Sequence, residues 1–161
     1  MNQKLNIAIS SYRSAPFGGG QGIFIYELSK ALQSLGHIVD IISGPPYPNL
    51  EPKINLIRSP GLNLFSTFVF KERLKIFLNK KNKSLDDWYE FSSTLLGGFP
   101  EIRTFGNRLS YLLQNSSYDI LIDNQSLSFG VLQVQNKIPV IEIVHHPITK
   151  DYKYESIFER R

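Results

Sequence analysis

The chain has 161 residues, of which 42% are hydrophobic and 20% are charged, and its formal net charge is +4 at pH 7. This is the balance of an ordinary globular domain, and the mild positive charge favours anionic partners without requiring them. The sequence has no cysteine, which excludes disulfides, zinc–thiolate sites and a cysteine nucleophile, and it has no apolar run near the roughly 20 residues of a membrane-spanning helix. We therefore expect one cytoplasmic domain over residues 1–161.

The first forty residues predict a strand, a helix and a second strand. The apolar run 5–10 is typical of a buried strand. Apolar residues then recur at helical spacing from about Gln21 to Leu35, and Gly36 stands where a left-handed C-cap would end the helix. Residues 37–42 predict the second strand, and a strand–helix–strand unit makes the two strands parallel neighbours.

The middle of the chain is predicted to be mostly helical over residues 62–114, after a short third strand at 54–57. Ser84 is the predicted N-cap of a second helix, and a third helix is expected over 101–114. The helix that opens this middle region, around residues 70–81, is basic and amphipathic. It either packs on the core or lies on an anionic bilayer. Its apolar face consists of Phe70, Leu74, Phe77 and Leu78.

The last part of the chain returns to strand-like runs that end in polar residues. Residues 118–122 predict a strand that ends at Asp123-Asn124-Gln125, and Ser126 is the predicted cap of a short helix that reaches Gln135. Residues 140–144 predict the last strand, which ends at His145-His146. Together these elements predict an α/β fold: a Rossmann-like, doubly wound, mainly parallel sheet flanked by helices.

Three polar segments follow three of the predicted strands. They are the glycine loop at residues 18–22, the tip at 123–126 and the histidine pair at 145–146. Ligands of open parallel α/β sheets bind beyond the carboxyl ends of the strands, where these segments should meet. The sequence therefore predicts one site along that edge.

The glycine loop precedes the first predicted helix. Gly18, Gly19 and Gly20 let backbone N–H groups approach a ligand closely, and a helix N-terminus suits a phosphate or a developing anion. The alternative is a tight turn without a ligand. The pattern is not a dinucleotide fingerprint, because Ile23 occupies the place of the last glycine and Asp40 lies inside the second strand rather than at its end.

His145 and His146 are adjacent, so in an extended segment they point to opposite sides. They do not share a metal comfortably, and His37 is at the far end of its strand, so no metal is expected. One imidazole is expected to face the crevice and to exchange hydrogen bonds near neutral pH. The alternative is a polar residue that fills a strand end.

Several segments together resemble the N-terminal domain of family 4 glycosyltransferases. The family's usual forms are Gly-Gly-x-Gln/Glu, Leu-x-x-x-Gly-His-x-Val, an "Asp-x-x-x-x" strand at the acceptor site and Ile-Pro-x-Val-x-x-x-His. The matching segments here occur in the same order and cover nearly the whole chain: Phe17 to Ile23 with Glu27-Leu28, Leu35 to Asp40, Tyr118 to Gln125 and Ile138 to His146.

The resemblance implies one half of a GT-B enzyme that transfers a sugar from a nucleotide-diphosphate sugar to an acceptor, with retention of anomeric configuration and without a metal or other cofactor. It implies that Gly18, Gly19, Gly20 and Gln21 face the donor diphosphate. His145, or His146 if the register differs by one residue, would sit near the reacting sugar as the catalytic residue. Asp123, Asn124 and Gln125 would lie by the sugar or lipid-linked acceptor.

The donor-binding half of such an enzyme, with its Glu-x7-Glu motif, does not occur in these residues. We expect it to be a missing C-terminal domain or a separate partner chain, and we expect the isolated chain to be inactive. Two other functions remain open: a non-catalytic Rossmann-like module that holds a phosphate compound or a partner, and peripheral contact at the inner face of the membrane through the basic helix. Nucleic acid is not expected, because no recognised module is present.

Overall fold

The computed structural model describes residues 3–16 and 20–145, apart from the side chain of Phe65. The described residues form one parallel sheet in the order β3-β2-β1-β4-β5, flanked by helices, so the predicted Rossmann-like α/β fold is confirmed. The strands are β1 (Asn6–Ser11), β2 (Ile38–Ser43), β3 (Asn55–Arg58), β4 (Ile120–Asn124) and β5 (Val140–Ile143). The helices are α1 (Gly20–Ser34), the short 3-10 helix η1 (Leu64–Ser66), α2 (Phe70–Asn79), α3 (Leu85–Leu95), α4 (Glu101–Leu113) and α5 (Phe129–Val134).

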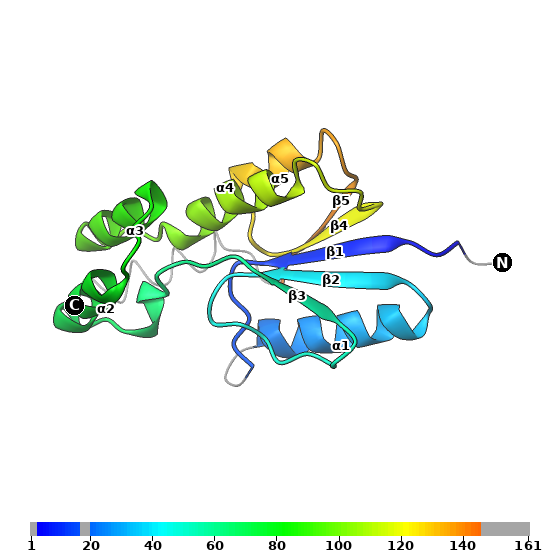
Figure 1. Cartoon of the computed structure of the whole chain (residues 1–161), viewed down its shortest axis with the longest axis horizontal. Helices are drawn as coiled ribbons and strands as arrows, with labels where there is room; N and C mark the ends of the chain where they lie inside the picture. Colours follow the sequence, from blue (N-terminus) through cyan, green and yellow to red (C-terminus); the bar gives the residue numbers. More distant parts are fainter. Residues whose placement is uncertain (1–2, 17–19, 146–161) are drawn as a thin grey trace.

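The sheet is covered on both faces, α1 lying on one face and α4 and α5 on the other (Figure 1). Because side chains alternate along a strand, neighbouring residues of β1 enter different cores. Ile7 and Ile9 pack with Ile25 of α1, whereas Ala8 packs with Phe105 and Leu109 of α4. The fold therefore has two apolar cores that share one sheet.

The helix–sheet units form for the local reasons that the sequence indicated. α1 ends at Ser34, and Gly36 follows with φ of 94°, the left-handed conformation expected there. Ser84 caps α3 in a reciprocal capping box with Asp87, which confirms the predicted N-cap. α4 and α5 touch backbone to backbone, because a Cβ on Gly130 would lie only 2.0 Å from the carbonyl oxygen of Gly106.

α2 and α3 form a lobe beyond the carboxyl ends of the strands (Figure 1). Its small core contains Phe77, whose ring stacks on Phe91 at 4.5 Å between centroids. The predicted apolar face of α2 is only partly right. Phe70 and Leu78 are 53% and 62% exposed, and Ile76 packs against the core in their place. In the described part of the chain, no helix combines the length and apolar character that crossing a bilayer requires.

The predicted cap at Ser126 is wrong. The Ser126 main-chain N–H and hydroxyl both donate to the Asp123 carboxylate, which turns the chain back on itself after β4. Gln125 and Leu127 flank it with φ of 55° and 46°, a conformation that does not start a helix. α5 consequently begins two residues later than predicted, at Phe129, with Ser128 in place of Ser126 at the N-cap position.

Candidate functional site

The candidate site lies at the carboxyl edge of the sheet, where β1, β4 and β5 end beside the start of α1. β4 continues to Asn124, so its last two residues point to opposite faces. Asp123 lies on the face of α4 and α5, in register with Ser10 and Glu142, and Asn124 lies on the face of α1. The pleat of one strand thus separates two polar clusters.

The cluster on the α1 face is built around the His145 imidazole. Its Nε2 lies 2.6 Å from Oδ1 of Asn124, and its ring packs edge-on against Phe24 of α1 at 4.9 Å between centroids. The His145 main-chain N–H donates to Oε1 of Gln125 at 3.0 Å. Three elements therefore hold the histidine: the end of β4, the turn after it and the second turn of α1.

A chain of hydrogen bonds with assigned donors determines which ring nitrogen of His145 carries the proton. The Ser11 hydroxyl donates to the carbonyl oxygen of Arg13 at 2.7 Å, and the Asn124 amide nitrogen donates to that hydroxyl at 3.3 Å. The Asn124 amide oxygen is therefore an acceptor, so Nε2 of His145 donates to it. In neutral imidazole, Nδ1 is then the nitrogen that accepts a proton or a hydrogen bond. His145 is exposed, which keeps this ring accessible from the edge of the sheet.

The cluster on the opposite face is built around the buried Asp123 carboxylate. It accepts hydrogen bonds from the Ser10 hydroxyl at 2.5 Å, from Ser126 N–H at 2.8 Å and from the Ser126 hydroxyl at 2.7 Å. Glu142 is its neighbour on β5, and burial together with the Asp123 charge raises the pKa of the Glu142 carboxyl to about 8. This cluster holds the turn that presents Gln125 to the histidine.

The start of α1 supplies the third part of the site. The helix begins at Gly20, and Gln21 stands one turn before Phe24, the residue that contacts the His145 ring. Gly22 packs against the preceding loop so tightly that a Cβ there would lie 2.1 Å from the Ala15 carbonyl oxygen. A 15-residue helix aims its unpaired N–H groups and its positive dipole end at this edge.

The structure brings together most of the predicted residues that it describes. Asn124, Gln125 and His145 are in contact, and α1 starts beside them. Asp123 is fully buried and holds the turn through its hydrogen bonds. Gly18, Gly19 and His146 lie outside the described residues. The roles assigned to all these residues in sugar transfer stay predictions.

Sequence reasoning missed Glu142, Ser11 and Phe24. Glu142 interrupts an otherwise apolar strand, which was the available signal, but its meaning depends on the register with Asp123. Phe24 reads as an ordinary core residue of the helix. Among residues 3–16 and 20–145, no group of three or more histidine, aspartate or glutamate side chains is arranged as metal ligands would be.

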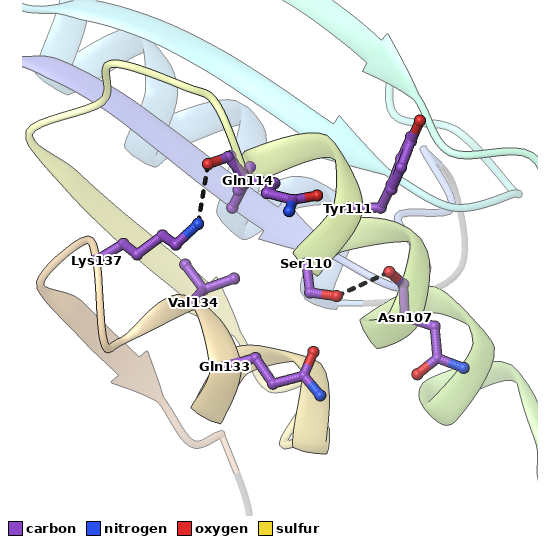
Figure 2. Close-up of a pocket in the computed structure, with 8 residues that line it drawn as sticks. Asn107, Ser110, Tyr111, Gln114, Gln133, Val134 and Lys137 are labelled. Carbon is purple, nitrogen blue, oxygen red and sulfur yellow. Dashed lines mark hydrogen bonds between the residues drawn. The ribbon is translucent and has the colours of Figure 1, made fainter.

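An open hollow of about 410 Å³ lies between α4 and α5 (Figure 2). Gln114, directly after α4, and Lys137, before β5, line it, and the Lys137 amine donates to the Gln114 carbonyl oxygen at 3.2 Å. Both residues belong to the amino edge of the sheet because each precedes the start of a strand. The hollow is therefore separate from the histidine site.

No family model matches the chain. Its sequence is 37% identical over 155 residues to the MMP alpha-(1->4)-mannosyltransferase of Mycolicibacterium hassiacum. The alignment covers 94% of this chain and 37% of that relative, so the chain spans little more than a third of the relative's length. The similarity therefore extends over nearly all of the sheet and helices described above.

Proposed function

We propose that this chain is the N-terminal, acceptor-side domain of a retaining glycosyltransferase of the GT-B, family 4 type. It belongs to an enzyme that transfers a sugar from a nucleoside-diphosphate sugar to an acceptor. The similarity to a mannosyltransferase supports the reaction class and makes mannose the first donor sugar to test. The observation that carries the proposal is the His145 imidazole, oriented by Asn124 and Gln125 beside the start of α1.

The geometry suits a reaction in which a diphosphate leaves as an anion and a sugar hydroxyl is held by a hydrogen bond. The N-terminus of α1 offers unpaired N–H groups to the departing diphosphate, a role we assign to Gly18, Gly19, Gly20 and Gln21. The His145 Nε2–H is already used by Asn124, so Nδ1 is the nitrogen left to accept a hydrogen bond from a sugar hydroxyl. Gln125 and Asn124 hold that ring without themselves ionising.

The substrates follow from this assignment. The relative is named for an α-(1→4) linkage, so a sugar with a free 4-hydroxyl is the acceptor class we propose, and mannosides are the first to test. We propose that neither a metal nor another cofactor takes part, that the protein acts in the cytoplasm, and that the sugar nucleotide is bound mainly by a facing domain. On this proposal, the 161-residue chain alone does not turn over a sugar nucleotide.

The test uses the longest open reading frame that contains this chain, purified as one polypeptide. It is incubated with nucleoside-diphosphate mannose, glucose or galactose and with mannosides of increasing length, and nucleoside-diphosphate release is measured. We expect mannosyl transfer that His145→Ala lowers by roughly 100-fold or more in kcat. His37→Ala is the matched control, because His37 lies at the amino edge, where it accepts a hydrogen bond from Leu5 N–H.

Two results would contradict the proposal. The first is brisk turnover by the 161-residue chain alone, because one Rossmann-like unit would then suffice. The second is nucleoside-diphosphate binding by the longest polypeptide without transfer to any sugar. That outcome would favour the alternative of a non-catalytic phosphate-binding module at the start of α1.

A further inference from the structure

Two carboxyl groups stand side by side beneath the candidate site. Asp123 on β4 and Glu142 on β5 are register partners in parallel strands, so their side chains project from the same face of the sheet. That face carries α4 and α5, since Leu121 and Val140 on the same strands pack into the core of those helices. Two neighbouring carboxylates repel each other when both are ionised, and here Asp123 is fully buried and Glu142 is half-buried.

The contacts of Asp123 are those that suit an ionised carboxylate. Four donors reach its carboxylate: the Ser10 hydroxyl, the Ser126 hydroxyl and N–H, and the Leu127 N–H at 3.3 Å. Hydrogen bonds of this kind favour the charged form of an acid. These donors compensate for the complete burial of the Asp123 side chain.

Glu142 has the opposite surroundings. Its carboxyl accepts from the Gln125 main-chain N–H, and it also hydrogen-bonds the Asp123 carboxylate. Its Oε1 is buried and receives no donor from any described residue. A bond between two carboxyl groups requires a proton on one of them, and the donors around Asp123 favour the charged form of its carboxylate. The proton therefore belongs to Glu142.

We infer that Glu142 is a positioning residue: in its protonated form it bridges Asp123 and Gln125 and so holds the turn after β4 in the shape that orients His145. Gln125 is the link, because its main-chain N–H binds Glu142 while its side chain accepts the His145 N–H. Gln125 and Leu127 both have left-handed backbones, which side-chain-bearing residues adopt only when their surroundings hold them. The link to sugar transfer rests on the proposed function.

Loss of the Glu142 proton should release this turn. The charged group that acts on Glu142 is Asp123, and the remaining contact is the neutral Gln125 N–H, so no described cation offsets a second negative charge. Burial and Asp123 raise the pKa of Glu142 to about 8, above its ordinary value near 4.5. Between these values the unfolded chain ionises Glu142 and the folded chain does not. The stabilisation is thus complete below about pH 4.5 and is lost as pH rises to about 8.

The first test measures unfolding of the 161-residue chain as a function of pH. For wild type, the contribution of Glu142 raises the unfolding equilibrium constant by up to about tenfold per pH unit across this interval. Glu142→Gln is neutral, still donates to Asp123 and still accepts from Gln125, so the difference from wild type should grow with pH. Glu27→Gln on the exposed side of α1 is the control and should follow wild type. A constant difference between Glu142→Gln and wild type from pH 5 to 8.5 would overturn the inference.

The second test follows the His145 ring by NMR in the same chain. We expect its ring resonances to show an additional inflection near pH 8 in wild type, and this inflection should vanish in Glu142→Gln. His37 at the amino edge is the internal control and should show none. If the variant does not fold, the pH titration of the Glu142 carboxyl carbon resonance in wild type is the deciding measurement. A midpoint below about pH 5.5 contradicts the inference. Neither test uses turnover, so a failure here is separate from a failure of the proposed enzyme activity.

Discussion

Two buried carboxyl clusters in this molecule are stabilised in different ways. Glu90 in the α2–α3 lobe is fully buried and is paired with the Arg108 guanidinium of α4 at 3.2 Å. Asp123 and Glu142 beneath the candidate site receive only neutral donors and each other. The Arg108 charge compensates Glu90 at every ordinary pH, because arginine does not lose its charge. In the second cluster, a proton on Glu142 takes the place of a cation. The first is suited to permanent support and the second to a response within the neutral range.

The largest expected effect is at the cluster that contains a cation. Arg108→Met should cost about 3–5 kcal/mol of unfolding free energy, because it leaves Glu90 buried without its positive partner. Denaturant unfolding monitored by circular dichroism measures this loss. Arg103→Met on the same helix is the matched control. Arg103 is exposed and its guanidinium lies 5.3 Å from the Tyr89 ring centre, so a change within about 0.5 kcal/mol is expected. Equal losses of unfolding free energy in Arg108→Met and Arg103→Met would show that the buried Glu90 does not depend on its arginine partner.

An intermediate effect is expected at the cluster that contains a proton. Asp123→Asn keeps the shape of the side chain but removes the charge that several donors face, at a cost of about 1.5–3 kcal/mol. The same change removes the negative neighbour that helps raise the pKa of Glu142. The Glu142 carboxyl should therefore titrate at lower pH in this variant, which carboxyl carbon NMR measures. An unchanged Glu142 titration would show that burial alone sets its pKa.

The smallest effect comes from removing one neutral hydroxyl donor in each cluster. Thr104→Val removes a 2.6 Å bond to Glu90, and Ser10→Ala removes a 2.5 Å bond to Asp123. Each should cost about 1–1.5 kcal/mol, because both acceptors keep other donors. Unfolding of the two variants in parallel is the measurement. A much larger loss for Ser10→Ala would mean that the cluster without a cation depends on every one of its donors.

Local patterns in the sequence predicted much of this fold. The helical spacing of Phe24 and Leu28, the glycine after α1 and the polar cap of α3 depend on neighbours along the chain, so they are readable without coordinates. The parallel sheet followed from those units by the rule of crossover connections. The placement of Asn124 and His145 at one edge followed from the same rule.

The missed features depend on contacts between distant residues. Glu142 and Asp123 meet because β4 and β5 pair in one register, and Phe24 meets His145 across more than a hundred residues of chain. The cap assigned to Ser126 was wrong because an acid three residues earlier captures both of its donors. Phe70 and Leu78 were expected on the packed face of α2, but both are exposed and Ile76 packs against the small core of the α2–α3 lobe instead.

The backbone contact between Gly106 and Gly130 has a mechanical consequence. Side chains usually fill the space between two packed helices. No side chain lies between α4 and α5 where the two glycine backbones meet, so a larger residue at either position would push the helices apart. α3 lies just ahead of α4 in the chain, and α5 begins directly after the turn that holds Gln125. A larger residue at Gly106 or Gly130 would therefore disturb the start of α5 and, through it, the turn that holds Gln125.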